Sequence, residues 1–190
     1  MFASRNKHKV EQVALLLPEV ELVVLDEVAP GVELEEPFET FEQNAWAKAS
    51  AVVGLTALAA IADDSGLEVD VLGGEPGVRS ARYAGEGASD QDNNDKLVRE
   101  LRKLGEEEAL CRYRCVAIYV DPDGREIVTE GWCEGRVVLE GRGELGFGYD
   151  PHVIPDGETR TMGEIPLEEK LRFSHRGIAF RRLADQLADL

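Results

Sequence analysis

The sequence is poor in cysteine, and basic residues are far outnumbered by acidic ones. Only three cysteines, Cys111, Cys115 and Cys133, occur in the 190 residues. Their odd number and the absence of C-x-x-C spacing argue against a disulfide framework or a zinc site. Because they lie in segments that alternate like strands, we expect three buried free thiols.

Long hydrophobic runs are also missing. No segment approaches the roughly 20 consecutive apolar residues that a membrane-spanning helix needs. The N-terminal segment M-F-A-S-R-N-K-H-K lacks the apolar stretch that a secretory signal carries after its basic residues. We therefore expect a cytoplasmic protein without a membrane partner.

The deficit of basic residues limits the partners of the chain. Lysine and arginine number 21 against 38 aspartates and glutamates, a formal net charge of −17. A surface of this sign repels DNA, RNA and anionic lipid, so we expect no nucleic-acid partner. Any anionic ligand would need a local basic pocket or a metal ion.

What the sequence does contain is alternating helix and strand patterns. Helices are predicted over 7–17 with Asn6 as N-cap, over 40–54 with Thr40 as N-cap and Gly54 at the exit, over 89–105, and from about Ser174 onward. Strands are predicted over 21–28, 57–62 and 66–74, and as a hairpin over 111–120 and 125–140. Because the elements interleave without a strict βαβ repeat, we predict an α/β fold, a mixed β-sheet flanked by helices, in one domain over 1–190.

The segment D-D-S-G, residues 63–66, places two adjacent aspartates after a predicted buried strand. A plain turn is one interpretation, since these residue types favour turns. However, adjacent carboxylates raise each other's pKa unless a cation offsets their repulsion. Carboxylates at the C-terminal end of a strand are a usual way to hold Mg²⁺. We therefore predict magnesium here, with a further carboxylate from Glu35 or Glu36.

Basic residues gather at the predicted starts of two helices, where the macrodipole and unpaired N–H groups disfavour cations. One group is S-R-N-K-H-K, residues 4–9, and the other is Ser174, His175 and Arg176, with Lys170 one turn earlier. A solvated basic turn is the ordinary interpretation. In so acidic a chain we favour an anion site at each start, holding two parts of one anionic ligand.

Two further motifs allow more than one interpretation. Asn44 and Lys48 share a helix face, and Lys48 points either to solvent or to a phosphate. In G-F-G-Y-D-P, residues 146–151, glycine permits close backbone approach, and Phe147 and Tyr149 could stack on a base. Core packing of Tyr149 and a turn role for Asp150 are the alternatives, and for Asp150 we prefer the turn.

Together these segments resemble the inosine/xanthosine triphosphate pyrophosphatases, enzymes that clear non-standard purine nucleotides. The resemblance follows nearly the whole chain in order, through A-S-R-N-K-H-K, T-F-E-Q-N-A-W-A-K-A, the long block I-A-D-D-S-G-L-E-V-D-V-L-G-G-E-P-G-V-R-S-A-R-Y-A-G, G-F-G-Y-D-P and E-E-K-L-R-F-S-H-R. It implies an elongated fold of two lobes with a central cleft, a homodimer and a Mg²⁺ requirement. It also implies hydrolysis of ITP, dITP and XTP to the monophosphate and pyrophosphate.

The resemblance also assigns roles by position. Asp64 corresponds to the catalytic acid/base and a metal ligand, and Glu35 to a second metal ligand. The chain departs from the usual pattern at Ser4-Arg5, where Thr-Gly is common, and at Phe38, where glycine is common. With Lys48 added, the predicted substrate-binding set is Ser4, Arg5, Asn6, Lys7, His8, Lys9, Lys48, Ser65, Phe147, Gly148, Tyr149, Asp150, Lys170, His175 and Arg176.

Base selectivity is expected from hydrogen bonds, because hypoxanthine and xanthine present a 6-keto acceptor and an N1–H donor where adenine reverses both. His175, Arg176 and backbone amides near Phe147 are the predicted readers. Two alternative functions stay open. One is a house-cleaning pyrophosphatase for modified pyrimidine or other damaged nucleotides, and the other is a non-catalytic nucleotide sensor.

Overall fold

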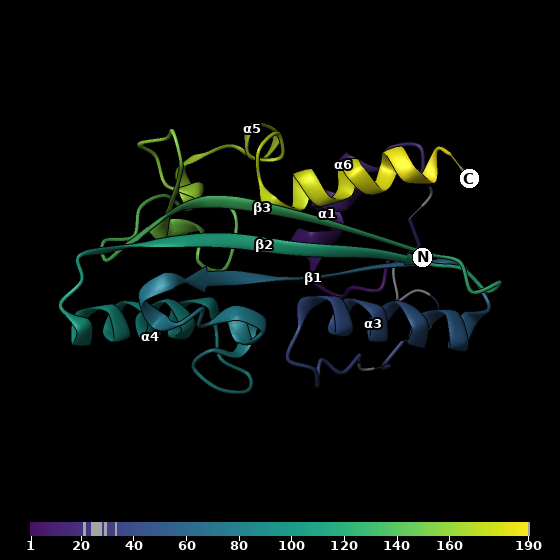
Figure 1. The fold of residues 1–190 in the computed structure, drawn as a ribbon, viewed down its shortest axis with the longest axis horizontal. Helices are drawn as coiled ribbons and strands as arrows, with labels where there is room; N and C mark the ends of the chain where they lie inside the picture. Colours follow the sequence, from purple (N-terminus) through teal and green to yellow (C-terminus); the bar gives the residue numbers. More distant parts are fainter. Residues whose placement is uncertain (21, 24–27, 29, 33, 190) are drawn as a thin grey trace. The chain divides into compact units, whose positions relative to one another are not determined.

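The computed structural model describes residues 1–20, 22–23, 28, 30–32 and 34–189 (Figure 1). Most of the strand predicted over 21–28 lies outside these residues. The helices are α1 (Lys7–Leu16), α3 (Phe41–Thr56), α4 (Asp90–Leu104), α5 (Leu167–Lys170) and α6 (His175–Leu187). The strands are β1 (Ala60–Val69), β2 (Glu108–Val120), β3 (Glu126–Val138) and β4 (Val153–Pro155).

The strands form a four-stranded sheet in the order β1-β2-β3-β4. The predicted hairpin is confirmed: β2 and β3 are joined by a tight turn in which the Asp121 N–H donates to the Arg125 carbonyl oxygen at 3.1 Å. β3 then pairs antiparallel with β4. A parallel bridge from Phe2 to Ile61 adds the other direction, so the predicted α/β fold with a mixed sheet is confirmed.

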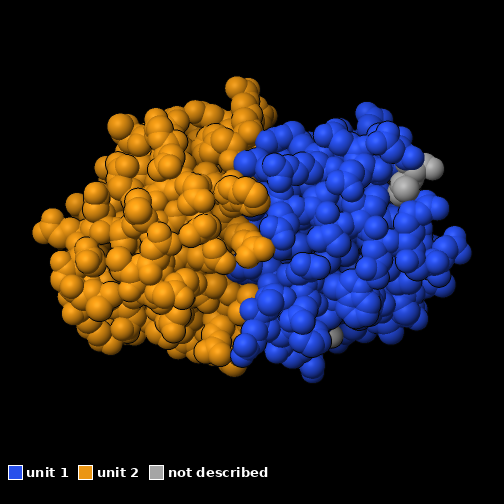
Figure 2. All heavy atoms as spheres, viewed as in Figure 1, with its two compact units in different colours: residues 1–64, 115–131, 175–190 blue, residues 65–114, 132–174 orange. Residues whose placement is uncertain are grey.

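The chain divides into two compact units (Figure 2). Unit 1 comprises Met1–Asp64, Cys115–Gly131 and His175–Leu190, and unit 2 comprises Ser65–Arg114 and Trp132–Ser174. In unit 1, α1 and α6 lie on one side of the strands and α3 lies on the other (Figure 1). In unit 2, α4 packs its apolar face, including Leu97 and Leu101, against β1, β2 and β3.

Helix starts follow the predicted caps. The Asn6 side chain accepts from the backbone N–H groups of His8 and Lys9, Thr40 caps α3, and Ser89 forms a full capping box with Asp92. These short polar side chains satisfy N–H groups that have no partner within their helix. Local sequence therefore determines where these helices begin.

Two boundaries differ from the prediction. The helix α3 passes Gly54 and ends at Thr56, because Ala57 adopts the left-handed conformation, with φ 53°, and donates its N–H to the Val53 carbonyl oxygen. The next strand therefore begins at Ala60 rather than Ala57. It also continues through residues 63–66, so the predicted acidic turn is wrong.

All three cysteines are free and buried, as predicted. Burial raises the pKa of the Cys111 and Cys133 thiols to about 12. Within the part of the chain that the structure describes, no helix is both long and apolar enough to cross a membrane.

Close approach of β3 to the start of α6 depends on Gly131. A methyl group at this position would overlap the backbone carbonyl oxygen of His175 and lie 2.6 Å from the backbone nitrogen of Ala179. Because backbone atoms cannot rotate away, we predict that Gly131→Ala lowers the free energy of unfolding by about 1–3 kcal/mol. Urea unfolding followed by circular dichroism measures this change.

A matched control is Gly54→Ala in α3, where an added methyl group meets no heavy atom within 4 Å. This variant should be as stable as the parent or gain up to about 1 kcal/mol from the better helix propensity of alanine. Parent-like stability of Gly131→Ala would contradict the close packing described here.

Candidate active site

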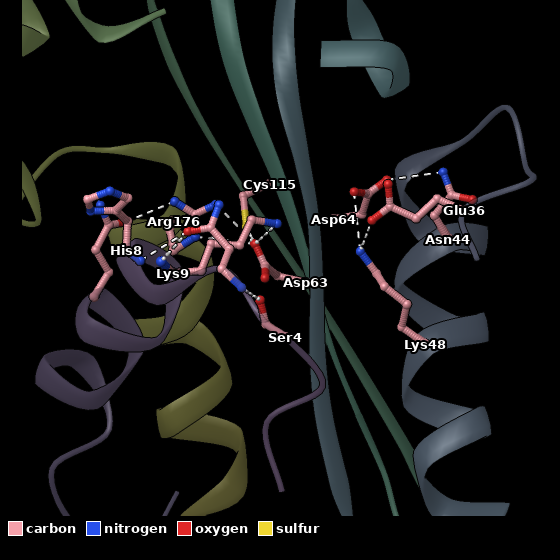
Figure 3. A network of polar contacts seen from close by, with 12 residues as sticks. Ser4, His8, Lys9, Glu36, Asn44, Lys48, Asp63, Asp64, Cys115 and Arg176 are labelled. Atoms are coloured by element: carbon pink, nitrogen blue, oxygen red, sulfur yellow. Dashed lines mark hydrogen bonds and ion pairs between the residues drawn. The ribbon is translucent and has the colours of Figure 1, made fainter. Parts of the chain in front are cut away.

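The adjacent aspartates of β1 point to opposite faces of the strand. Successive side chains alternate in a β-strand, so Asp63 and Asp64 cannot share a face. Figure 3 shows Asp63 directed toward α1 and α6, and Asp64 directed toward α3. The repulsion expected from their adjacency is thus reduced by geometry, and each carboxylate has its own cationic partner within unit 1.

Asp63 is the centre of a buried cationic group. Its Oδ2 accepts from Arg176 Nε at 3.2 Å and Nη2 at 3.1 Å, and Lys9 Nζ lies 3.2 Å away. Arg176 Nη1 also donates to Gln12 Oε1 at 2.8 Å. The exposed fractions of Asp63 and Arg176 are 1% and 2%.

Electrostatics keep Asp63 ionised. Burial on its own would raise the pKa of this carboxyl, but Lys9 and Arg176 together hold the pKa well below its usual value. Two cations against one carboxylate leave this group with a formal charge of +1. The side chain of Lys9 keeps 14% exposure, so the excess charge is presented at the start of α1.

Asp64 belongs to an acidic group on the other face. Lys48 Nζ lies 3.4 Å from Asp64 Oδ1 and 2.5 Å from Glu36 Oε1, and Asn44 Nδ2 donates to Asp64 Oδ2 at 3.1 Å. Two carboxylates against one ammonium leave a formal charge of −1. The Lys48 side chain is only 6% exposed, so the interpretation in which it points to solvent is wrong.

The pKa values in this group shift together. Burial raises the pKa of Asp64, and Glu36 raises it further, while Lys48 opposes both without cancelling them. Burial would lower the pKa of Lys48, but Asp64 and Glu36 outweigh it and the pKa is raised. Asp64 is therefore a carboxylate whose proton affinity is enhanced, as a general base requires.

Asn44 ties the loop before α3 to Asp64. Its Oδ1 accepts from the Phe38 N–H at 2.9 Å, and its Nδ2 donates to the Phe38 carbonyl oxygen at 3.1 Å as well as to Asp64. These contacts involve only the backbone of residue 38, whose ring is exposed. Phenylalanine is therefore compatible with this loop at a position where glycine is common.

The donor set on this face suits a hard divalent cation. Among the described residues, no cluster of three or more histidines, cysteines, aspartates or glutamates is positioned to hold a metal. Asp64 and Glu36, however, both face the same ammonium, and two carboxylates completed by water and phosphate are a usual Mg²⁺ environment. Glu35, the predicted second ligand, is exposed, whereas Glu36 lies against Lys48.

Unit 2 contains a second polar group around Asp150. Lys170 Nζ lies 2.8 Å from Asp150 Oδ2, Tyr113 Oη donates to Oδ1 at 3.2 Å, and the Phe147 N–H donates to Oδ2 at 3.3 Å. Asp150 therefore stabilises the glycine-rich loop, which confirms its predicted turn role. Tyr149 is buried in the core and donates to the Ser80 carbonyl oxygen at 2.8 Å, which favours core packing over stacking on a base.

The other predicted residues differ in their exposure. Arg5, Asn6, Lys7 and His8 are exposed at the start of α1, and Ser4 is half-buried. Ser65, Phe147, Gly148 and His175 are half-buried, and Ser174 is buried. Arg176 is enclosed with Asp63, a position that favours supporting the site over contacting a base. The first-turn N–H groups of His8 and Lys9 are already occupied by Asn6.

Sequence reasoning missed two polar residues that hold these groups. Gln12 is buried beside Val13 in α1. Its residue type gave no signal of this role, because glutamine is mostly exposed in folded proteins. Tyr113 likewise gave no signal, because an aromatic residue in a strand is ordinary core composition.

The sequence model of the Ham1 family matches residues 1–186. A Geobacter sulfurreducens protein named dITP/XTP pyrophosphatase is 44% identical, covering 97% of this chain and 94% of its own. A solved Ham1 protein from Coxiella burnetii has a TM-score of 0.91 at 33% identity, covering 100% of this chain and 98% of its own.

A solved structure from Mycobacterium abscessus, described as a nucleoside-triphosphatase or dITP/XTP pyrophosphatase, has a TM-score of 0.76 at 40% identity, covering 98% of this chain and 97% of its own. In each comparison, the match covers nearly the full length of both proteins. They agree with the family that the sequence motifs resemble. This chain belongs to the Ham1 family.

Proposed function

We propose that the protein hydrolyses the non-standard purine nucleoside triphosphates ITP, dITP and XTP to the monophosphate and pyrophosphate in the presence of Mg²⁺. The observation that carries this proposal is the pairing of a cationic group at Asp63 with an acidic group at Asp64 in one unit. Such a pair offers a place for an anionic phosphate chain and a place for a divalent cation. The names of the Ham1 relatives support the same substrates.

In this proposal Asp64 and Glu36 hold the metal, which when bound neutralises charge on the phosphates and lowers the pKa of water. Asp64 accepts the proton of the attacking water, in keeping with its raised pKa. Lys9 and the start of α1 hold the polyphosphate, and Asp63 and Arg176 keep Lys9 in place. Positioning and electrostatics of this kind dominate catalysis of phosphoryl transfer.

Base selection by hydrogen bonds stays a prediction from the sequence. The predicted amide readers are occupied, since the N–H groups of Phe147 and Gly148 already donate to Asp150 and Asp90. Lys170 and Asp150 are likewise paired with each other, at 2.8 Å. The homodimer, the cytoplasmic location and the absence of a nucleic-acid partner stay predictions from the sequence.

The substrate range tests the proposal directly. With Mg²⁺ present, kcat/KM for ITP, dITP and XTP should exceed that for ATP by about 100-fold or more, because adenine leaves buried polar groups unpaired. The assay measures pyrophosphate and orthophosphate separately for each nucleotide, with dUTP and GTP included. A preference for dUTP would favour the alternative pyrophosphatase, binding without turnover would favour the sensor, and orthophosphate alone would indicate a phosphatase.

Removing the charge of Asp64 should separate chemistry from binding. We expect Asp64→Asn to reduce kcat for ITP by about 1,000-fold or more, because the proton acceptor and a metal ligand are lost together. The amide keeps the size of the side chain, so ITP should still bind, as measured by calorimetry, and the thermal midpoint should stay close to that of the parent. Parent-like turnover would refute the assigned role.

The second carboxylate can be identified by comparing two neighbouring glutamates. Glu36→Gln should raise the Mg²⁺ concentration that gives half-maximal activity by about tenfold, since Glu36 faces the same ammonium as Asp64. Glu35→Gln, whose side chain is exposed, is the matched control and should stay within about twofold of the parent. The reverse order of effects would restore Glu35 as the ligand.

A further inference from the structure

Lys48 occupies the position between the two carboxylates that we assign to the metal. Its ammonium is 2.5 Å from Glu36 Oε1 and 3.4 Å from Asp64 Oδ1, and its side chain is 6% exposed. Burial of a cation is tolerated only when anions compensate for lost hydration. The ammonium thus balances the same negative charges that a divalent cation would balance.

The ammonium and a divalent cation compete for these two carboxylates. Mg²⁺ binds carboxylate oxygens at about 2.0–2.1 Å and holds its other ligands in a tight octahedron. An ammonium within hydrogen-bond distance of the same Glu36 oxygen would lie close to the ion and repel it. Entry of the metal therefore favours release of Lys48 from at least one of its two partners.

We propose that Lys48 is an exchangeable counter-ion, which holds Asp64 and Glu36 together until a divalent cation replaces it. The released ammonium then needs another anion, and a phosphate of the nucleotide supplies one; this second step rests on the proposed function. Metal and triphosphate binding are thereby coupled through one side chain. Asn44 keeps Asp64 and the Phe38 backbone in place during the exchange.

The metal affinity of the protein without nucleotide distinguishes an exchangeable Lys48 from a Lys48 that only binds phosphate. Without any nucleotide, Lys48→Met should bind Mn²⁺ at least about tenfold more tightly than the parent, because a competing cation is gone. Electron paramagnetic resonance of free Mn²⁺ measures this affinity, and displacement by Mg²⁺ gives that of the natural candidate ion. If Lys48 serves only phosphate, the metal affinity of the bare protein should not rise.

Two control variants separate competition from a change in net charge. Lys48→Arg keeps a cation at the site and should not tighten Mn²⁺ binding. Lys103→Met removes one charge from a largely exposed ion pair with Glu100 and should leave the affinity within about twofold. Equal or weaker metal binding by Lys48→Met, or equal tightening in any control variant, would overturn the exchange.

A second measurement uses the parent protein, in case Lys48→Met does not fold. Acetic anhydride labels accessible amines, and peptide mass spectrometry reports the extent of labelling at each lysine. Saturating Mg²⁺ alone should increase labelling of Lys48 several-fold and leave Lys103 unchanged. Unchanged protection of Lys48 at saturating metal would overturn the proposal. Because these experiments contain no nucleotide, a failure to hydrolyse ITP would leave their outcome intact and would count against the proposed function alone.

Discussion

The site depends on the two-residue period of a β-strand. Because consecutive side chains point to opposite faces, Asp63 and Asp64 have separate environments although they are adjacent in the chain. One carboxylate has an excess of positive charge around it and stays ionised. The other has an excess of negative charge and a raised pKa. A single strand thus separates a place suited to an anion from a place suited to a cation.

Burying these charged side chains costs free energy, and contacts with the neighbouring helices offset part of that cost. A buried ion pair stabilises little by itself, but a partner left unpaired is strongly destabilising. Arg176 therefore fixes the start of α6 to β1, and its contact with Gln12 fixes α1 to the same point. On the other face, Asn44 links α3, the preceding loop and β1. The network gives these helices one arrangement around the two carboxylates.

Much of the fold follows from local signals, whereas the partners of the site do not. The caps Asn6, Thr40 and Ser89 and the β2–β3 hairpin were predictable, because they rest on contacts between residues near one another in the chain. The segment 63–66 was predicted as a turn from its composition, but cationic partners distant in sequence stabilise it as a strand.

The sequence also could not show which of Glu35 and Glu36 faces Lys48. Their local sequence is equivalent, and only the loop conformation held by Asn44 and Phe38 decides which carboxylate faces Lys48. Likewise, the sequence indicated that two adjacent aspartates need a compensating cation, but it could not show that protein cations already supply one on each face.

A chain with a net charge of −17 can bind a polyanion because charge acts locally. Ions screen exposed charges beyond about 10 Å at ordinary ionic strength, so most surface carboxylates contribute little at the site. The buried groups on β1 are screened far less and determine the local potential. In the proposed function, overall acidity should therefore slow the approach of a nucleotide more than it weakens the bound state, and Lys9 and the metal would supply the local attraction. In the proposed function, a divalent ion bound at Asp64 and Glu36 would neutralise the acidic face of β1, so that this face would no longer repel the triphosphate.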